Sequence, residues 1–484
     1  MAFDTGSRLS SFGDERPPAV VVAVQLPNVS DEELASSLEE LERLATTLGL
    51  EPVGRVTQRR KGLATGIVLG EGKLVELATW TGGHGKVEAY VRPGGKQKKD
   101  KTDEDEDDDD DEDDEESAEP TSDAPEPDDA AVSAKPDGTP RAKVVLVDHD
   151  LTPTQQRNLE KATGVEVLDR TSVILEIFHR HAKTREARMQ VEIAKLRYLA
   201  PRLREGGGGG DRVRGGIGGK GAGETSLELD RRRIRDRIAE LKNELSQVAG
   251  GAQNRRTRRS ELPTVALVGY TNAGKSSLMR SLTSSDVYIA DKLFATLDTT
   301  VRRLQPPTDP PILVTDTVGF IKKLPHDLVA SFRSTLDEAG DADLLLHIVD
   351  AADAALSDQL AVTREVLREI EADRVPTWLV LNKIDRVDAD GRRRLADHYP
   401  NAIQLCAKDQ ADVATLREHL IEHFVGKLEE TELVVPYALQ KVAHLIHERT
   451  TVLVEEHGDE GTRFVVRAPG RVLEDLRTRL AVTS

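Results

Sequence analysis

Residues 264–277, TVALVGYTNAGKSS, decide the fold of the central part of this 484-residue chain. The β-branched and apolar run 264–268 predicts a short buried strand, the glycine-rich segment 269–276 predicts a loop, and the pattern that follows predicts a helix. Glycines let successive backbone N–H groups converge on phosphate oxygens at a helix N-terminus. Lys275 can supply a charge to the β- and γ-phosphates, and the Ser276 hydroxyl can coordinate Mg²⁺. We therefore expect a P-loop that binds a nucleoside triphosphate.

A second motif follows the next predicted strand downstream. The apolar run 312–315 ends in Asp316, Thr317, Val318 and Gly319. A carboxylate directly after a strand can hold the water shell of a metal ion, and the N–H group of Gly319 can contact the γ-phosphate. We therefore expect Asp316 to assist in Mg²⁺ binding and Gly319 to sense the γ-phosphate.

Two later motifs select the base. The run 379–381 leads to Asn382, Lys383 and Asp385. A carboxylate at Asp385 can accept two hydrogen bonds from N1 and N2 of guanine, and adenine has no such donor pair on that edge. The run 403–405 leads to Cys406, Ala407 and Lys408, whose backbone can donate to guanine O6. Four motifs in this order, each after a predicted strand, indicate a GTP-binding domain.

The predicted nucleotide site consists of these loops and the start of the helix after the first loop. Its residues are Gly269, Tyr270, Thr271, Asn272, Ala273, Gly274, Lys275, Ser276, Ser277, Asp316, Thr317, Val318, Gly319, Asn382, Lys383, Asp385, Cys406, Ala407 and Lys408. We interpret Cys406 as a small buried residue beside the base and not as a nucleophile, because no base or redox partner lies near it in the sequence.

Two residues depart from the simplest GTPases. Phe320 stands where a Ras-like enzyme has the glutamine that orients the attacking water, and a phenyl ring cannot polarise water. Intrinsic hydrolysis should therefore be slow. Asn272, inside the phosphate loop, can either coordinate K⁺ near the α- and β-phosphates, where it would offset developing charge, or only stabilise the turn.

The net charge of the chain comes from one segment. The formal charge is -19, and residues 100–129 contain 20 Asp and Glu against one Lys. The remainder is neutral, so the acidic balance does not exclude a nucleic-acid partner. The segment 92–140, which contains this run, has almost nothing to bury and is predicted to be a disordered insert, either a solvated tether or a mimic of RNA phosphates.

The compartment is predicted from what the sequence does not contain. A single cysteine excludes a disulfide framework and a cysteine-rich zinc site. The N-terminal stretch has no apolar core of an export signal, and no run of about 18 apolar residues occurs. We expect a cytoplasmic protein without a membrane partner.

The part before the P-loop is predicted to contain a small α/β domain and two long helices. Strands are expected at 19–25, 66–69, 87–91 and 144–147, with a helix that begins at a capping box of Ser30 and Glu33. Apolar residues recur every three or four positions in 184–203 and 227–248, which predicts an antiparallel helical hairpin. The glycine-rich loop 206–223 joins these helices. Its basic residues Arg212, Arg214 and Lys220 form either a plain linker or an RNA-contacting tip.

The predicted organisation is that of an α/β multidomain protein. A P-loop GTPase domain with a parallel-dominated sheet is preceded by the small α/β domain and the hairpin, and a small α/β domain follows it. The predicted divisions are a disordered tail 1–18, the α/β domain 19–180, the hairpin 181–260, the GTPase domain 261–428 and the C-terminal domain 429–484. The arginines of 255–259, just before the GTPase domain, are expected in a linker or at a phosphate backbone.

Longer segments resemble one family. GYTNAGKSSL (269–278), ADKLFATLDTTVRRL (290–304), DTVGFIKKLPHDLVASFRSTLDEAGDADLLLHIVDA (316–351) and KTREARMQVEIAKLRYLAPRL (183–203) are similar to the HflX subfamily of translation-factor GTPases. The resemblance covers most of residues 19–428 and includes Phe320, because the family lacks the catalytic glutamine.

The resemblance implies a ribosome-associated GTPase. Its N-terminal half would dock on the large ribosomal subunit, with the glycine-rich tip near ribosomal RNA, and it would split stalled or idle ribosomes. On the family pattern Thr296 is the switch threonine, so Lys275, Thr296 and Gly319 are expected to act in hydrolysis and Ser276, Thr296 and Asp316 to hold Mg²⁺. We expect a monomer that binds GTP and GDP and whose slow hydrolysis is stimulated by the ribosome.

Two other functions remain open from the residues. One is a K⁺-dependent GTPase that assists an RNA-modification complex, for which Asn272 is the relevant residue. The other is an RNA-binding or remodelling module with little nucleotide turnover, for which the hairpin and the loop 206–223 are the relevant segments.

Overall fold

A computed structural model describes residues 16–87, 138–203, 226–259, 262–284, 293–294, 297, 299–323, 333–426, 428–459 and 461–481. The chain forms two compact units, Met1–Arg170 and Thr171–Ser484. Several predicted features lie outside the described residues. These are the tail up to residue 15, the predicted strand 87–91 beyond residue 87, most of the acidic insert, the loop 206–223 with Arg212, Arg214 and Lys220, and Thr296.

The first unit contains a four-stranded parallel sheet in the order β2-β1-β3-β4. Its strands are β1 (Pro18–Gln25), β2 (Glu51–Arg59), β3 (Val144–Val147) and β4 (Glu166–Asp169). Its helices are α1 (Asp31–Leu48), α2 (Glu71–Thr81) and α3 (Pro153–Thr163). The runs AVVVAV in β1 and VVLV in β3 are fully buried, because a parallel sheet covered by helices hides both of its faces.

Local signals in this unit have mixed outcomes. The capping box is confirmed, since the Ser30 side chain accepts from the Glu33 N–H and the Glu33 side chain accepts from the Ser30 N–H. The prediction of a strand at 66–69 is wrong. These residues form bends and irregular backbone, although Val68 and Leu69 are buried. The missed strands are β2 and β4, the two edge strands of the sheet; the polar sequence EPVGRVTQR of β2 hides the period of a buried strand.

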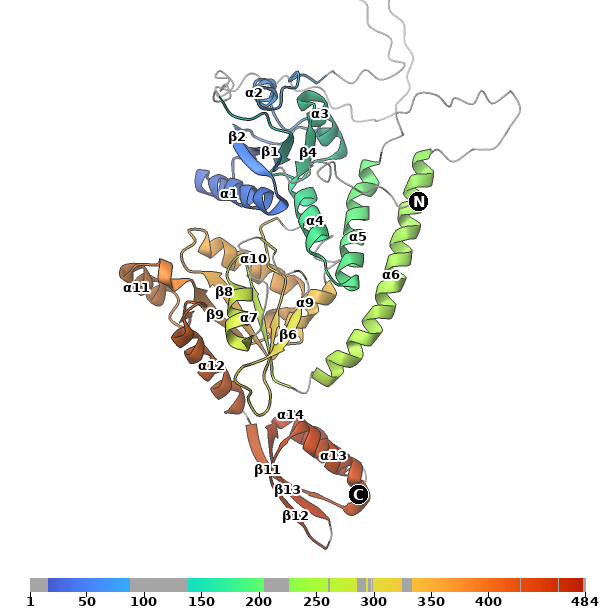
Figure 1. Ribbon diagram of the computed structural model, residues 1–484, viewed down its shortest axis with the longest axis vertical. Coiled ribbons are helices and arrows are strands. Elements are labelled where there is room, and N and C mark those ends of the chain that lie inside the picture. Colours follow the sequence, from blue (N-terminus) through green and yellow to red (C-terminus); the bar gives the residue numbers. More distant parts are fainter. Residues whose placement is uncertain are drawn as a thin grey trace, which may run out of the picture. The chain divides into compact units, whose positions relative to one another are not determined.

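A helical hairpin begins the second unit. Helix α4 (Arg170–His181) leads into α5 (Arg185–Leu199), a short 3₁₀ turn η3 (Ala200–Arg202) and the 34-residue α6 (Ser226–Arg259). Helices α5 and α6 lie side by side (Figure 1). The seam between them is formed by Met189, Ile193, Leu196, Ile234 and Leu241.

Ion pairs show that the two long helices are antiparallel. Arg185 pairs with Glu244 at 2.6 Å, and Glu192 pairs with Arg237 at 2.9 Å. Moving forward along α5 therefore moves backward along α6. The hairpin prediction is thus confirmed for the described part of both helices. Helix α6 continues through the arginines of 255–259, so the segment expected as a linker or phosphate contact is helical.

The nucleotide-binding motifs lie on a six-stranded sheet of the order β10-β9-β8-β5-β7-β6. All neighbours are parallel except β6 and β7. The strands are β5 (Thr264–Gly269), β6 (Thr300–Arg303), β7 (Leu313–Asp316), β8 (Leu344–Asp350), β9 (Thr377–Asn382) and β10 (Ile403–Gln404). The prediction of a parallel-dominated sheet is confirmed.

Helices cover both faces of this sheet. One apolar layer packs the strands against α7 (Lys275–Thr283) and α12 (Gln410–Val425), and the other packs them against α9 (Arg333–Gly340) and α10 (Leu356–Glu369). The remaining elements are α11 (Ala389–His398) and the turns η4 (Ala372–Arg374) and η5 (Ile384–Arg386). Because parallel strands end at the same edge, the loops after β5, β7 and β9 meet there.

The C-terminal part is a three-stranded antiparallel sheet with two helices on one face (Figure 1). Its elements are β11 (Leu428–Val435), η6 (Tyr437–Leu439), α13 (Gln440–Arg449), β12 (Thr451–His457), β13 (Thr462–Pro469) and α14 (Gly470–Ala481). The predicted strands and first helix are confirmed, and α14 was missed. Across the described ranges, no helix is both long and apolar enough to span a membrane.

A buried histidine lies in the middle of the nucleotide-binding sheet. His347 on β8 is 2% exposed. Burial lowers the pKa of this imidazole to about 3, and the charges of Arg364 and Lys275 act in the same direction. The folded chain therefore keeps His347 neutral in a range of pH where the unfolded chain binds a proton.

We predict that His347 makes folding sensitive to acid. As the pH falls below about 6.5 the unfolded state gains a proton that the folded state does not, so stability falls by about 1.4 kcal/mol per pH unit until the folded pKa is reached. His347→Leu should lose this component. Urea unfolding midpoints at neutral pH and about one unit below pH 6.5 measure it. His419→Leu, at an exposed histidine, is the control and should keep the acid response of the wild type. An equal acid response in His347→Leu and His419→Leu would contradict the assignment.

Candidate nucleotide site

Strand β5 leads directly into the phosphate loop, and α7 begins at Lys275. The Lys275 side chain is folded back onto the loop, since its Nζ donates to the carbonyl oxygens of Gly269 at 3.0 Å and Tyr270 at 2.9 Å. Burial lowers the pKa of Lys275 to about 8, and the nearby Asp316 opposes this shift. The loop thus holds a desolvated cation at a helix N-terminus, where phosphate oxygens would be favourable partners.

Asn382 joins the phosphate loop to the base loop. Its Nδ2 donates to the Ala273 carbonyl at 2.8 Å, and its Oδ1 accepts from the Ala407 N–H at 2.9 Å. Gly274 has a φ of 99°, and a Cβ at this position would overlap Nδ2 of Asn382. The position therefore requires glycine for two reasons, its left-handed backbone and the close approach of the amide.

Lys383 adds a second bridge between these loops. Its Nζ donates to the Asn272 carbonyl at 2.7 Å and pairs with Asp350 at 2.7 Å. Asn272 itself is exposed and has a φ of 60°. Asparagine is one of the few residues that adopt this conformation readily, which favours the turn-stabilising alternative for Asn272.

The two described metal ligands of the prediction lie together. The Ser276 Oγ donates to Oδ2 of Asp316 at 2.8 Å, and Asp316 is fully buried at the end of β7. A hydroxyl and one carboxylate at this spacing fit Mg²⁺, which is usually bound by few protein oxygens together with water and substrate phosphates. Thr296, the third predicted ligand, is outside the described residues.

The segment after Asp316 is hydrogen-bonded to the phosphate loop. The Phe320 N–H donates to Gly269 O at 3.1 Å, and the Thr271 N–H donates to Phe320 O at 2.8 Å. The Phe320 side chain is 2% exposed and packs in the apolar layer with Val268 and Leu336. Phe320 is thus a core residue beneath the loop, which is consistent with the expectation that it does not orient water.

Other predicted residues of this segment are also packed. Thr317 is fully buried and donates to Leu267 O at 2.7 Å, and Val318 is 5% exposed. The Tyr270 hydroxyl accepts from the Lys322 N–H at 2.7 Å. Ser277 is half-buried in the first turn of α7. The phosphate loop and the segment 317–322 are therefore joined by hydrogen bonds and packed together.

Cys406 contacts the predicted base-reading carboxylate. A hydrogen bond from the Cys406 thiol lowers the pKa of Asp385, so this carboxylate stays ionised. Burial raises the pKa of Cys406, and the bond to Asp385 acts in the same direction. The interpretation of Cys406 as buried is wrong, because it is partly exposed at the surface of the loop. Its thiol form agrees with its not being a nucleophile.

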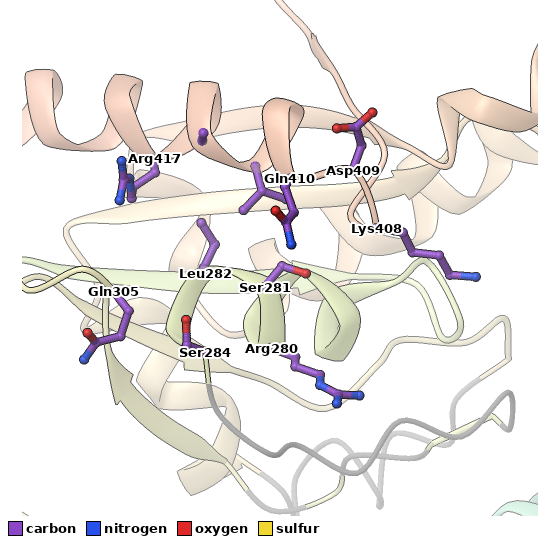
Figure 2. A pocket seen from close by; sticks show the side chains of 11 residues that line it. Arg280, Ser281, Leu282, Ser284, Gln305, Lys408, Asp409, Gln410 and Arg417 are labelled. Atoms are coloured by element: carbon purple, nitrogen blue, oxygen red, sulfur yellow. The ribbon is translucent and has the colours of Figure 1, made fainter.

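A cavity of about 520 Å³ lies between α7 and α12, next to the base loop (Figure 2). It is lined by Arg280, Ser281, Leu282, Ser284, Gln305, Lys408, Asp409, Gln410, Val413, Ala414 and Arg417. Only Lys408 of this set was predicted. The sequence analysis also missed Ser281, whose Oγ donates to the Ala407 carbonyl at 2.7 Å. No motif signals this contact, because the two residues are 126 positions apart.

Comparisons with known proteins match almost the whole length of the chain. The family described as GTP-binding GTPase N-terminal matches residues 35–88 and 133–179, GTP-binding GTPase Middle Region matches 181–259, and 50S ribosome-binding GTPase matches 264–383. A protein of Gluconacetobacter diazotrophicus called GTPase HflX is 53% identical over 96% of this chain and 98% of its own. GTPase HflX of Escherichia coli is 38% identical over 87% and 86%.

Solved structures give a more distant likeness. A GTP-binding protein of Sulfolobus solfataricus in complex with GDP is 22% identical, with 84% of this chain and 99% of that chain covered and a TM-score of 0.39. A structure described as an SsGBP and GDP complex is 21% identical, covers 84% and 98%, and has a TM-score of 0.42.

We predict that Asp385→Asn weakens GDP binding by at least about 100-fold while adenine nucleotides are unaffected, because an amide cannot accept both guanine donors as the carboxylate can. Titration calorimetry with GDP and ADP measures the change. Asp388→Asn is the matched control, since Asp388 caps α11 through the Gly391 N–H and its amide retains that function. Unchanged guanine preference in Asp385→Asn would remove this residue from base recognition.

Proposed function

The chain belongs to the HflX family of GTPases, which bind and hydrolyse GTP, and on this premise we propose that it associates with the large ribosomal subunit and splits or rescues stalled or idle ribosomes. The observation that carries the proposal is the match of residues 264–383 to the family described as 50S ribosome-binding GTPase. The match of 181–259 to the GTPase middle region extends the likeness to the hairpin.

Hydrolysis follows from the roles of the loop residues. The phosphate-loop amides and Lys275 orient the triphosphate, Ser276 and Asp316 would hold Mg²⁺, and Gly319 presents its N–H to the γ-phosphate. The metal ion, when bound, neutralises charge that develops on the phosphates. Because Phe320 is packed in the core, the chain has no side chain at that position to orient water, so intrinsic hydrolysis is slow and the ribosome completes the site.

An aromatic contact supports transmission of the nucleotide state. Phe294 lies two residues before Thr296, in the segment expected to close on Mg²⁺ and the γ-phosphate. Its ring meets that of Phe178 on α4 edge to face, with centroids 4.6 Å apart, and both rings are at most 2% exposed. A conformational change in this segment would therefore alter its contact with α4, the helix that follows the N-terminal sheet.

We predict that the chain co-sediments with large ribosomal subunits more strongly with a non-hydrolysable GTP analogue than with GDP, and that subunits raise kcat at least about tenfold. Phe294→Ala should reduce the difference between the two nucleotides, because the ring contact with α4 is lost. Phe424→Ala, which removes a ring from the core at α12, is the control for lost stability. Subunit stimulation of only a few per cent would overturn the proposal.

A further proposal concerns the monovalent ion. If Asn272 coordinates K⁺, hydrolysis in KCl should exceed hydrolysis in NaCl at least about tenfold, and Asn272→Gly should abolish the difference while keeping the left-handed turn. Steady-state phosphate release measures both rates. Equal rates in the two salts would leave Asn272 with the turn-stabilising role alone.

A further inference from the structure

Thr271 in the phosphate loop has a buried hydroxyl that the described structure does not use. The residue is 6% exposed, and its Oγ1 has no hydrogen-bond partner within the described part of the chain. Buried hydroxyls are almost always paired, because an unmade hydrogen bond costs stability. A hydroxyl kept unpaired inside a ligand-binding loop is thus a candidate for pairing with the ligand.

The position of Thr271 identifies that ligand. A Cβ added at Gly319 would lie 2.8 Å from Cγ2 of Thr271 and 3.0 Å from Nζ of Lys275. Thr271, the switch glycine and the phosphate-binding lysine therefore converge within the width of one methyl group. The γ-phosphate is the part of GTP that the lysine and the switch glycine contact.

The other polar groups nearby are already engaged. The Thr271 N–H donates to the Phe320 carbonyl, so it does not point at a phosphate. The Thr317 hydroxyl donates to Leu267 O, and the Ser276 hydroxyl donates to Asp316. Thr363 also has a buried, unpaired hydroxyl, but it lies on α10 and not in the phosphate loop. Location, and not the missing partner alone, singles out Thr271.

We propose that Thr271 is a catalytic residue whose hydroxyl donates a hydrogen bond to an oxygen of the γ-phosphoryl group during hydrolysis. The oxygen of water forms a bond to the γ-phosphorus, the bond to the β–γ bridging oxygen breaks, and GDP leaves with that electron pair. The proton of water passes to the phosphate product, and Thr271 keeps its own proton. The hydroxyl stabilises charge on the transferred group, a function that the buried Phe320 cannot perform.

The test compares two substitutions in the full-length chain without ribosomes, so that it is independent of ribosome binding. Thr271→Val keeps the shape and removes the hydroxyl, and Thr271→Ser keeps the hydroxyl. We expect Thr271→Val to lower the single-turnover rate of GTP hydrolysis at least about tenfold with GDP affinity within about twofold of the wild type. Thr271→Ser should remain within about threefold of the wild-type rate.

Two further measurements separate catalysis from structure. Binding of GDP with aluminium fluoride, which imitates the transferred phosphoryl group, should weaken in Thr271→Val and not in Thr271→Ser. Thr363→Val, the matched loss of a buried unpaired hydroxyl, should leave the rate unchanged. A Thr271→Val rate within about twofold of the wild type, or a parallel loss of rate and GDP affinity, overturns the proposal. If Thr271→Val does not fold, Thr271→Ala is judged by the same criteria.

Discussion

A cation removed from water is the constraint on which the nucleotide site depends. The Lys275 ammonium group is held between two loop carbonyls at the start of α7, with Asp316 as the nearby negative charge. Carbonyl dipoles compensate a desolvated charge less well than phosphate oxygens do. Strand β5, the turn at Gly274 and the bridge through Asn382 all serve to hold this group at one place.

The same frame links the two ends of the nucleotide site. Asn382 makes one hydrogen bond to the phosphate loop and one to the base loop, and Cys406 then fixes the Asp385 carboxylate. The phosphate loop is also bonded to Phe320 on its other side. The phosphate loop is therefore joined to the segment after Asp316 by backbone hydrogen bonds on one side and to the base loop through Asn382 on the other.

Phe320, in place of the glutamine of Ras-like enzymes, changes which groups assist hydrolysis. As a core residue it stabilises the layer between the sheet and α9, and it leaves the orientation of water to other groups. Two sources of catalytic assistance are proposed above, the hydroxyl of Thr271 and groups from the ribosome. The first acts on the phosphoryl charge in the isolated chain, and the second acts only in the complex.

The sequence alone determined the identity and order of the motif loops, because strand, glycine loop and helix are local patterns with strong backbone requirements, as at Gly274. It also determined the helical hairpin, whose apolar period is uninterrupted from Met189 to Leu196. It did not reveal β2, whose place at the sheet edge permits polar residues, or the continuation of α6 through 255–259. Only the tertiary structure placed Phe320 in the core, Ser281 against the base loop, and Thr271 and Lys275 next to Gly319, because each depends on contacts between segments far apart in the chain.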